Sequence, residues 1–203
     1  MSKHHRNRNW APAPQPLPED AHVIDNHTHV ASVVPFSQAM SHEAMEKGQG
    51  EVPVYSVDEL LEQAQKVGVE GVIDCGCELP NLMTAIDMAR EHPGTVHAAI
   101  AIHPNEAVLH GHRGAPGPDG LPIKYKPWHD IPFDEAMAEV HRLATTYPNQ
   151  VVAIGETGMD LFRTGESAKE LQREAFRAHI ALAKELNLPM QIHDRDSHKE
   201  VIE

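Results

Sequence analysis

Two histidines separated by one residue follow a short apolar run near the start of the chain, in Val23-Ile24-Asp25-Asn26-His27-Thr28-His29. Residues i and i+2 of a β-strand share a face, so His27 and His29 are expected to project the same way from a strand end. Neutral imidazole binds Zn, Fe, Mn and similar divalent ions. The pair therefore predicts a metal site. Because the chain has 16 His in 203 residues, the alternative is a chance pair of solvated loop histidines.

Further apolar runs along the chain also end in residues that bind metals or exchange protons. Besides the run at about residues 23–29, strands are expected at about residues 71–77, 96–102, 151–154 and 189–193. Their carboxyl ends carry Asp74, His103, Glu156 and His193. Parallel α/β folds place their active sites at that edge. Such residues at several independent strand ends favour one shared site over chance.

Helical patterns separate these strands. The expected helices are one opened by the capping box Ser56-x-x-Glu59, one over residues 82–89, one capped by Asp134 and running through Tyr147, one opened by the capping box Ser167-x-x-Glu170, and the start of another at the end of the chain. Residues 31–55 are expected to form a long connection. Residues 111–132, rich in Gly and Pro with Trp128 and several basic residues, are expected to form a loop of a kind that is often functional. The alternation predicts an α/β fold with a parallel sheet and helical crossovers.

Glu156 follows an apolar strand and lies between glycines, in Ile154-Gly155-Glu156-Thr157-Gly158-Met159-Asp160. Glycine permits a close backbone approach. A carboxylate in this position could bridge two divalent ions, one per oxygen, and the alternative is a turn carboxylate paired with a surface base. Asp160 is expected to support the site from behind or to form a turn.

His193 ends an apolar strand as His29 does, and a ligand role is favoured for it. Arg195 shares its face and could bind an anionic substrate bidentately, unless Asp194 and Asp196 neutralise it at the surface. His103 could donate to a phosphate, lie beside metals or be structural.

Composition limits the remaining possibilities. A formal net charge of −13 argues against a generally basic nucleic-acid binder, although bound divalent ions would supply local positive charge for a nucleic-acid substrate. Cys75 and Cys77 are interpreted as small buried hydrophobic residues in preference to metal ligands. Residues 1–20 are expected to be a disordered Pro-rich tail without a secretory core, and no run of roughly 18 apolar residues predicts a membrane span. A cytoplasmic location follows by default.

The whole set of motifs resembles the TatD-type metal-dependent deoxyribonucleases, within the amidohydrolase-like barrel superfamily. The resemblance spans nearly everything after residue 22, with its motifs in family order. It rests on Asp25-Asn26-His27-Thr28-His29, Ala101-Ile102-His103-Pro104, Gly155-Glu156-Thr157-Gly158-Met159-Asp160 and Gln191-Ile192-His193-Asp194-Arg195-Asp196.

The resemblance implies a (β/α)8 barrel of the TIM type with two divalent metal ions, Mg, Mn or Zn. By position it implies that His27 and His29 bind one metal, that Glu156 lies between the two, and that His193 binds the second. It makes Glu156 and His193 the catalytic candidates, and places His103 and Arg195 beside the substrate phosphate. The implied substrate is DNA, single-stranded or at its 3′ ends.

The chain departs from the family pattern in one respect. The family continues with another strand-end His and a later Asp that is expected to accept a proton from the attacking water, and neither has a counterpart here. Residues 21–203 are therefore expected to be the N-terminal part of a barrel, with about the first five β/α units, and with weak or no activity alone. The oligomeric state is not predicted.

Three functions are compatible with these observations. The first is hydrolysis of DNA phosphodiester bonds, in the manner of an exonuclease, by a metal-activated water. The second is hydrolysis of an ester or amide such as D-aminoacyl-tRNA by the same centre. The third is an inactive truncated remnant that acts only through binding or assembly.

Overall fold

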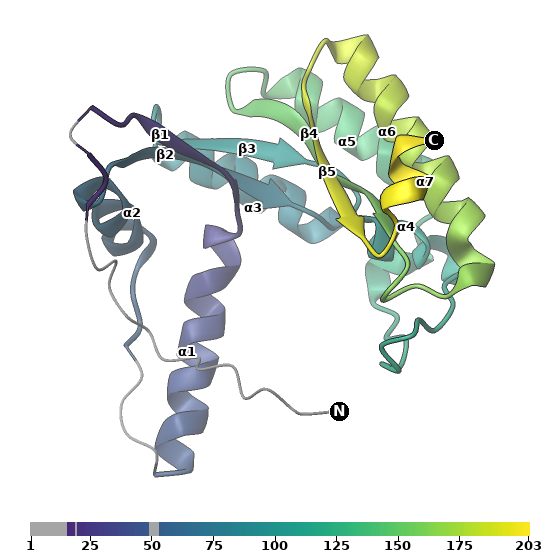
Figure 1. Cartoon of the computed structure of the whole chain (residues 1–203), viewed down its shortest axis with the longest axis horizontal. Helices are drawn as coiled ribbons and strands as arrows, with labels where there is room; N and C mark the ends of the chain where they lie inside the picture. Colours follow the sequence, from purple (N-terminus) through teal and green to yellow (C-terminus); the bar gives the residue numbers. More distant parts are fainter. Residues whose placement is uncertain (1–15, 19, 49–52) are drawn as a thin grey trace. The chain divides into compact units, whose positions relative to one another are not determined.

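A computed structural model describes residues 16–18, 20–48 and 53–203 (Figure 1). Most of the tail expected at residues 1–20 lies outside these described residues. The chain divides into two compact units, residues 1–25 with 30–71, and residues 26–29 with 72–203. The site residues predicted from the sequence all belong to the second unit.

The first unit contains the helices α1 (Val30–Glu46) and α2 (Val57–Lys66). The capping box predicted before α2 is confirmed. The Ser56 hydroxyl accepts the N–H of Glu59 at 3.2 Å, and the Ser56 N–H donates to the Glu59 carboxylate at 2.8 Å. These two bonds satisfy donors that a helix start otherwise leaves without a partner.

Helix α1 corrects the expectation of a long connection at residues 31–55. Its buried side chains, Ser37 and Ala44, are small, and Pro35 lies inside it. A buried face made of small residues gives a weak periodic signal. An interior proline removes one backbone hydrogen bond and argues against a helix in the sequence pattern. Both features explain why the sequence did not reveal this helix.

The strands form a single sheet in chain order, β1-β2-β3-β4-β5. Their bounds are β1 (Val23–Thr28), β2 (Val69–Gly76), β3 (Val96–Ile100), β4 (Val151–Asp160) and β5 (Met190–Arg195). The pairs β2–β3, β3–β4 and β4–β5 are parallel. Consecutive strands that lie side by side with helical crossovers are the arrangement of a β/α barrel. The predicted α/β class, with five β/α units, is confirmed.

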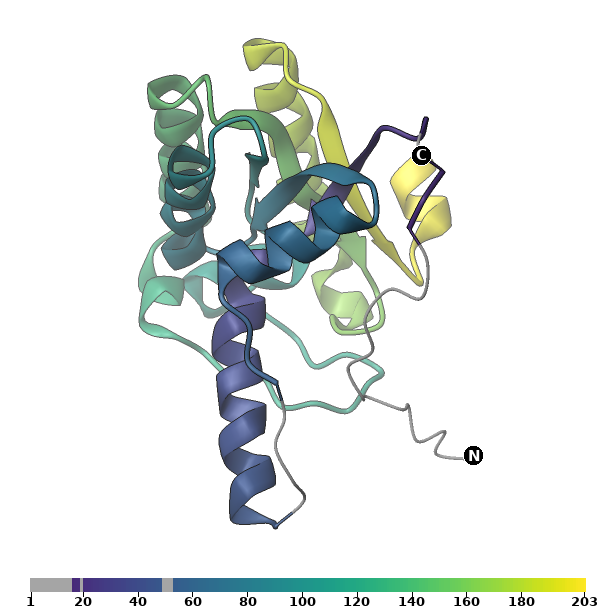
Figure 2. The ribbon, with the colours of Figure 1, turned by 90° about the vertical axis from the view of Figure 1, so that its left-hand side faces the viewer.

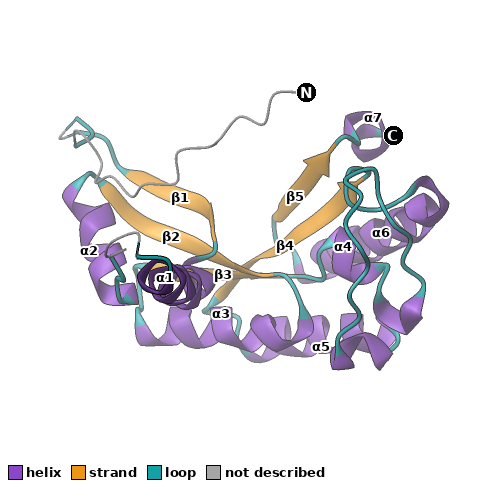
Figure 3. Cartoon of the chain, turned by 90° about the horizontal axis from the view of Figure 1, so that it is seen from below, coloured by secondary structure: helices purple, strands orange, loops and turns teal. Residues whose placement is uncertain are grey.

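Helices of the second unit cover one face of strands β3 to β5 (Figure 3). They are α3 (Leu79–Glu91), α5 (Phe133–Thr146) and α6 (Lys169–Leu186). The short helices α4 (Pro104–Ala107) and α7 (His198–Ile202) follow β3 and β5. Ile86 of α3 and Val140 of α5 are fully buried, as are Ile100 of β3 and Ile154 of β4. Burial of aliphatic side chains between sheet and helices supplies the main stabilising free energy of such a layer.

Two predicted helix starts are wrong. Helix α5 begins after Pro132 without a side-chain cap, so Asp134 does not cap it. The capping box expected at Ser167 is absent, because residues Glu166–Ala168 form a 3-10 turn and α6 begins at Lys169. The 3-10 turn supplies its own bond, from the Ala168 N–H to the Gly165 carbonyl at 2.9 Å.

Strand β4 extends six residues beyond the predicted end at Ile154 and includes Glu156 and Asp160. The extension pairs with β5, with Thr157 opposite Ile192 and Asp160 opposite Arg195. Gly155 and Thr157-Gly158 resemble a turn in the sequence, but this long-range pairing outweighs their local preference.

The glycines of this strand allow β4 and β5 to approach closely. A Cβ on Gly155 would lie 2.5 Å from the Cβ of Gln191, and one on Gly158 would lie 2.2 Å from the carbonyl oxygen of His193. Gly158 also has φ +146°, which side chains rarely adopt. These glycines therefore bring Glu156 and His193 together.

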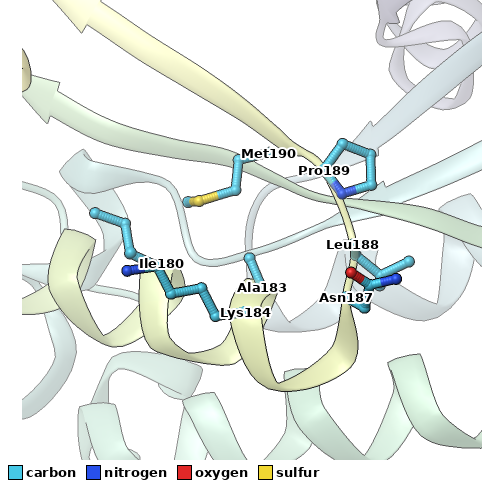
Figure 4. Close-up of a pocket in the computed structure, with 7 residues that line it drawn as sticks. All are labelled: Ile180, Ala183, Lys184, Asn187, Leu188, Pro189 and Met190. Carbon is cyan, nitrogen blue, oxygen red and sulfur yellow. The ribbon is translucent and has the colours of Figure 1, made fainter.

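A groove of about 410 Å³ lies at the amino-terminal end of β5 (Figure 4). It is lined by Ile180, Ala183 and Lys184 of α6 and by residues 187–190. In the described part of the chain, no helix is long and apolar enough to cross a membrane.

Candidate metal centre

The candidate site is built from the carboxyl ends of strands in the second unit. His27 is on β1 and His29 follows it, as the first motif predicts. His103 follows β3 at the start of α4, Glu156 is on β4 and His193 is on β5. These side chains form two groups with ligand atoms within 4.8 Å of one another: His27, His29 and Glu156, and His103, Glu156 and His193.

Glu156 joins the two groups through its two carboxylate oxygens. Its Oε2 lies 3.3 Å from Nε2 of His27 and 3.8 Å from Nε2 of His29. Its Oε1 lies 2.5 Å from Nδ1 of His193 and 3.9 Å from Nε2 of His103. One oxygen thus faces each imidazole pair.

His193 is held from behind by Asp160. Its Nε2 lies 3.1 Å from Oδ2 of Asp160, while its Nδ1 faces Glu156. Asp160 is fully buried and accepts the N–H groups of Phe162 and Arg163 at 3.0 and 2.8 Å. A carboxylate that binds the second nitrogen of a ligand imidazole fixes the ring and its tautomer. Asp160 accepts the N–H groups of the turn after β4, as one expectation had it, and its contact with His193 is the one that a supporting residue would make.

A second network connects this carboxylate to His103. The Asn105 side-chain amide donates to Oδ2 of Asp160 at 3.0 Å, and its backbone N–H donates to Nδ1 of His103 at 3.1 Å. The Thr164 hydroxyl donates to Oδ1 of Asn105 at 3.0 Å, so the oxygen and the nitrogen of this side-chain amide are both hydrogen-bonded. Because Nδ1 of a neutral His103 accepts this bond, its proton is on Nε2, the nitrogen that faces Glu156 and His193.

Contacts between the carboxylates and the imidazoles of the site shift the pKa values of both. Burial alone would raise the pKa of Glu156, but the hydrogen bond with His193 and the nearby imidazoles lower it to about 2. Burial alone would lower the pKa of His193, but the bonds with Asp160 and Glu156 raise it to about 9. Burial, together with the charge of His193, lowers the pKa of His103 to about 4. The carboxylates therefore stay ionised at neutral pH and favour positive charge between them.

Arg195 lies outside both imidazole groups. Its guanidinium carbon is 4.2 Å from the centre of the Phe162 ring, a cation–π distance. Asp194 binds His198 at 2.8 Å, and neither Asp194 nor Asp196 forms an ion pair with Arg195. Neutralisation of Arg195 by these two carboxylates, the alternative from the sequence, is therefore wrong.

The two cysteines occupy different environments. Cys75 is buried against Ala99 and Ala153, as a small hydrophobic residue should be. The sulfur of Cys77 lies 3.8 Å from Oε2 of Glu156, at the edge of the site. Burial, with the charge of Glu156, raises the pKa of this thiol, so it stays protonated. The interpretation as a purely packed pair missed this contact.

Other contacts close to the site involve Asp74, which the strand-end pattern predicts, and Thr28 and His179, which it does not. Asp74 is buried on β2, and the hydroxyl of Thr28, between the two histidines, donates to the carbonyl of Ile73 at 3.0 Å. His179 is fully buried and accepts the N–H of Ile102, next to His103, at 3.1 Å. Both contacts join residues distant in sequence, so no local pattern reveals them.

The donor set fits a divalent metal. Imidazole nitrogens with a shared carboxylate are typical ligands for Zn, Mn and related ions. The buried carboxylate behind His193 is the outer partner that ligand histidines usually have. The described residues thus contain a group of His and Glu side chains able to hold metal ions.

Comparison with known proteins finds metal-dependent hydrolases among the relatives of this chain. The chain is 33% identical over 146 residues to the uncharacterized metal-dependent hydrolase YabD of Bacillus subtilis, covering 72% of this chain and 47% of that protein. It is 32% identical over 145 residues to the 3'-5' ssDNA/RNA exonuclease TatD of Erwinia tasmaniensis, covering 71% and 46%. The chain therefore spans about half the length of the curated relatives it matches.

Solved structures give the same result. The structure of YJJV, a TatD homologue from Escherichia coli K12, matches with a TM-score of 0.58 at 25% identity, over 88% of this chain and 52% of that one. The TatD family hydrolase from Entamoeba histolytica matches with a TM-score of 0.63 at 20% identity, over 89% and 52%, which supports the fold alone. The sequence model of the TatD related DNase family matches residues 24–203. This chain belongs to the TatD related DNase family.

Proposed function

We propose that this chain carries the metal-binding half of a hydrolase that cleaves phosphodiester bonds of DNA. Glu156 carries this proposal, because each of its oxygens faces a different pair of imidazoles. Family membership and relatives described as ssDNA/RNA exonucleases or metal-dependent hydrolases support it.

In this proposal His27 and His29 hold one divalent ion, Glu156 bridges two, and His193 holds the second. When bound, such ions lower the pKa of water and stabilise charge on a phosphoryl group. Asp160 keeps the His193 ring in place. The native ion, Mg, Mn or Zn, follows from the donor set only as a class.

His103 has a different role in the proposal from the ligand histidines. Asn105 donates to its Nδ1, which leaves the proton on Nε2, so Nε2 acts as a donor and not as a metal ligand. A donor at this position can hold a non-bridging oxygen of the substrate phosphate. Arg195 is the second proposed phosphate contact, because its guanidinium has no carboxylate partner within ion-pair distance in the described chain.

The deciding experiment measures metal content and hydrolysis together. Purified chain is loaded with Mn²⁺, Zn²⁺ or Mg²⁺, its bound metal is quantified by mass spectrometry, and hydrolysis of bis(p-nitrophenyl) phosphate and of single-stranded DNA is followed. Two bound ions are expected, and any metal-dependent diester cleavage is expected to be weak, in keeping with the low activity expected of residues 21–203 alone. Turnover of D-aminoacyl-tRNA or another ester or amide without diester cleavage would replace this proposal, and protein that retains no metal would refute it.

A further inference from the structure

The loop between β3 and α5 carries cations that the metal centre does not use. Arg113, Lys124 and Lys126 are exposed, and no carboxylate oxygen lies within ion-pair distance of them in the described chain. Elsewhere lysines often pair with carboxylates, as Lys169 does with Glu200 at 2.7 Å. In a chain of formal net charge −13, cations without a carboxylate within ion-pair distance are a local exception, although the charge of Lys126 still acts on the carboxylate of Glu78.

The carboxylates of the same loop are already occupied. Asp119 accepts the N–H of Leu121 at 3.1 Å and lies 3.9 Å from Arg163. Asp130 lies 2.6 Å from Nε2 of His112. The positive charge of the loop is therefore not neutralised from within.

The loop is attached to the segments that carry the site residues. Trp128 and His129 bind the carboxylate of Glu106, which belongs to the α4 turn that starts at His103, at 3.2 and 2.7 Å. At its other anchor, the Asp119 N–H donates at 3.1 Å to the carbonyl of Phe162, two residues after the end of β4. In Figures 1 and 2 the loop lies beyond the arrowhead of β5.

Tyr125 stands between the two lysines with part of its ring exposed. The Tyr125 ring packs against the His112 ring, with centroids 4.3 Å apart and planes at 32°. Tyr125 is 40% exposed, although it packs against a second ring. A supported aromatic face between two cations is the arrangement on which single-stranded nucleic acids stack.

We propose that Lys124, Tyr125 and Lys126 form a binding surface for a single-stranded polynucleotide. The lysines hold neighbouring phosphates, and Tyr125 stacks on an unpaired base. This inference rests on the proposed function, because it supplies the contact that holds the strand whose phosphodiester reaches the metal centre. Duplex is disfavoured because its bases are already stacked and offer no free face.

The test separates binding from hydrolysis. Fluorescence anisotropy measures the affinity of the chain for labelled dT and U oligonucleotides in EDTA, over a series of salt concentrations. Lys124→Ala with Lys126→Ala should lower the slope of log affinity against log salt by about 1.4, since each lost phosphate contact on a single strand contributes about 0.7. Arg177→Ala with Lys184→Ala, a pair on α6 without carboxylate partners, is the matched control and should leave the slope unchanged.

Tyr125 is tested apart from the charges. Tyr125→Ala should weaken binding at least fivefold without changing the salt slope, and Tyr125→Phe should restore it, because the ring and not the hydroxyl stacks. Equal affinity for dT and U supports a contact made to phosphates and bases alone.

Two results would overturn the inference. One is an unchanged slope in the lysine variant, or an equal loss in the α6 control. The other is displacement of the oligonucleotide by an acidic peptide with no effect of Tyr125→Ala, which would make the surface a protein-binding one. Hydrolysis of bis(p-nitrophenyl) phosphate, which has no strand to hold, is measured on the same proteins. A lack of hydrolysis together with a lack of bound metal counts against the proposed function, whereas the anisotropy results decide the loop.

Discussion

The imidazoles on the two sides of Glu156 differ in how firmly the surrounding protein holds them. On the Oε1 side, the His193 side chain is 18% exposed and Asp160 holds its second nitrogen. On the Oε2 side, the side chains of His27 and His29 are 40% and 44% exposed. One half of the centre is therefore fixed by buried carboxylate and amide groups, whereas the other opens to solvent. A site of this kind combines a preorganised ligand with an accessible route for an ion.

Removing the charge of Glu156 is expected to weaken ion binding on both sides, because each of its oxygens faces one imidazole pair. Glu156→Gln keeps the shape but removes the charge that both imidazole pairs face, so we expect affinity for both ions to fall more than about a hundredfold, beyond the 10–100-fold typical of outer-shell changes. Calorimetric titration with Mn²⁺ measures this. His22→Gln, at an exposed histidine bound to Glu70, is the control. Loss of only one ion would show that Glu156 does not bridge.

The buried His179, which accepts the N–H of Ile102 next to His103, is expected to make the stability of the protein depend on pH. Burial lowers the pKa of His179 to about 4, although its bond to the Ala175 carbonyl opposes this. Below an ordinary pKa near 6.5 the unfolded chain binds a proton that the folded chain excludes, so the free energy of unfolding falls as pH falls from about 6.5 to 4. The loss attributable to this residue is up to about 3 kcal/mol.

Urea unfolding at a series of pH values measures this slope in the wild-type chain and in His179→Gln. The variant should be less stable at pH 7 and should lose less stability on acidification. His103, whose pKa is also lowered, contributes to both proteins and cancels in the difference. Parallel pH curves for the two proteins would contradict the prediction.

Asp160 tests whether the support behind His193 acts on one ion only. Asp160→Asn keeps the volume but removes the charge that fixes the imidazole, so the ion on the Oε1 side should bind about 10–100-fold more weakly. The ion near His27 and His29 should bind as before. A two-site titration isotherm separates these values, and circular dichroism confirms folding. An equal loss at both sites would mean that the two sides are not organised independently.

The same contrast explains how much the sequence could predict. His27, His103, Glu156 and His193 were all predicted because each follows an apolar run, which is a local pattern. The carboxyl edge of a parallel sheet then brings such residues together without further information. The order of strands and the pairing class follow from the same alternation.

The supporting residues depend on contacts that no local pattern contains. Asn105 reaches Asp160 across 55 positions, and His179 reaches Ile102 across 77. The extension of β4 was missed because Gly155 and Gly158 resemble a turn until β5 lies against them. Helix α1 was missed because small buried residues and Pro35 weaken its periodicity. Local patterns thus identify the side chains that meet at Glu156, and tertiary contacts decide how rigidly these side chains are held.

Substitution of Cys77 is expected to change metal affinity less than the substitutions above. It tests the Oε2 side of Glu156, where His27 and His29 are exposed to solvent. The Cys77 thiol is a weak donor at 3.8 Å from Oε2 of Glu156 and equally far from the carbonyl of Cys75. Cys77→Ala should therefore change the affinity of the ion near His27 and His29 by no more than about threefold, the lower range for a lost hydrogen bond. Titration with Zn²⁺, which favours sulfur more than Mn²⁺ does, is the sensitive measurement. If Zn²⁺ binding on this side collapses while Mn²⁺ binding does not, the thiol is a ligand, and the open side is organised by a third donor that becomes available only when a soft ion is present.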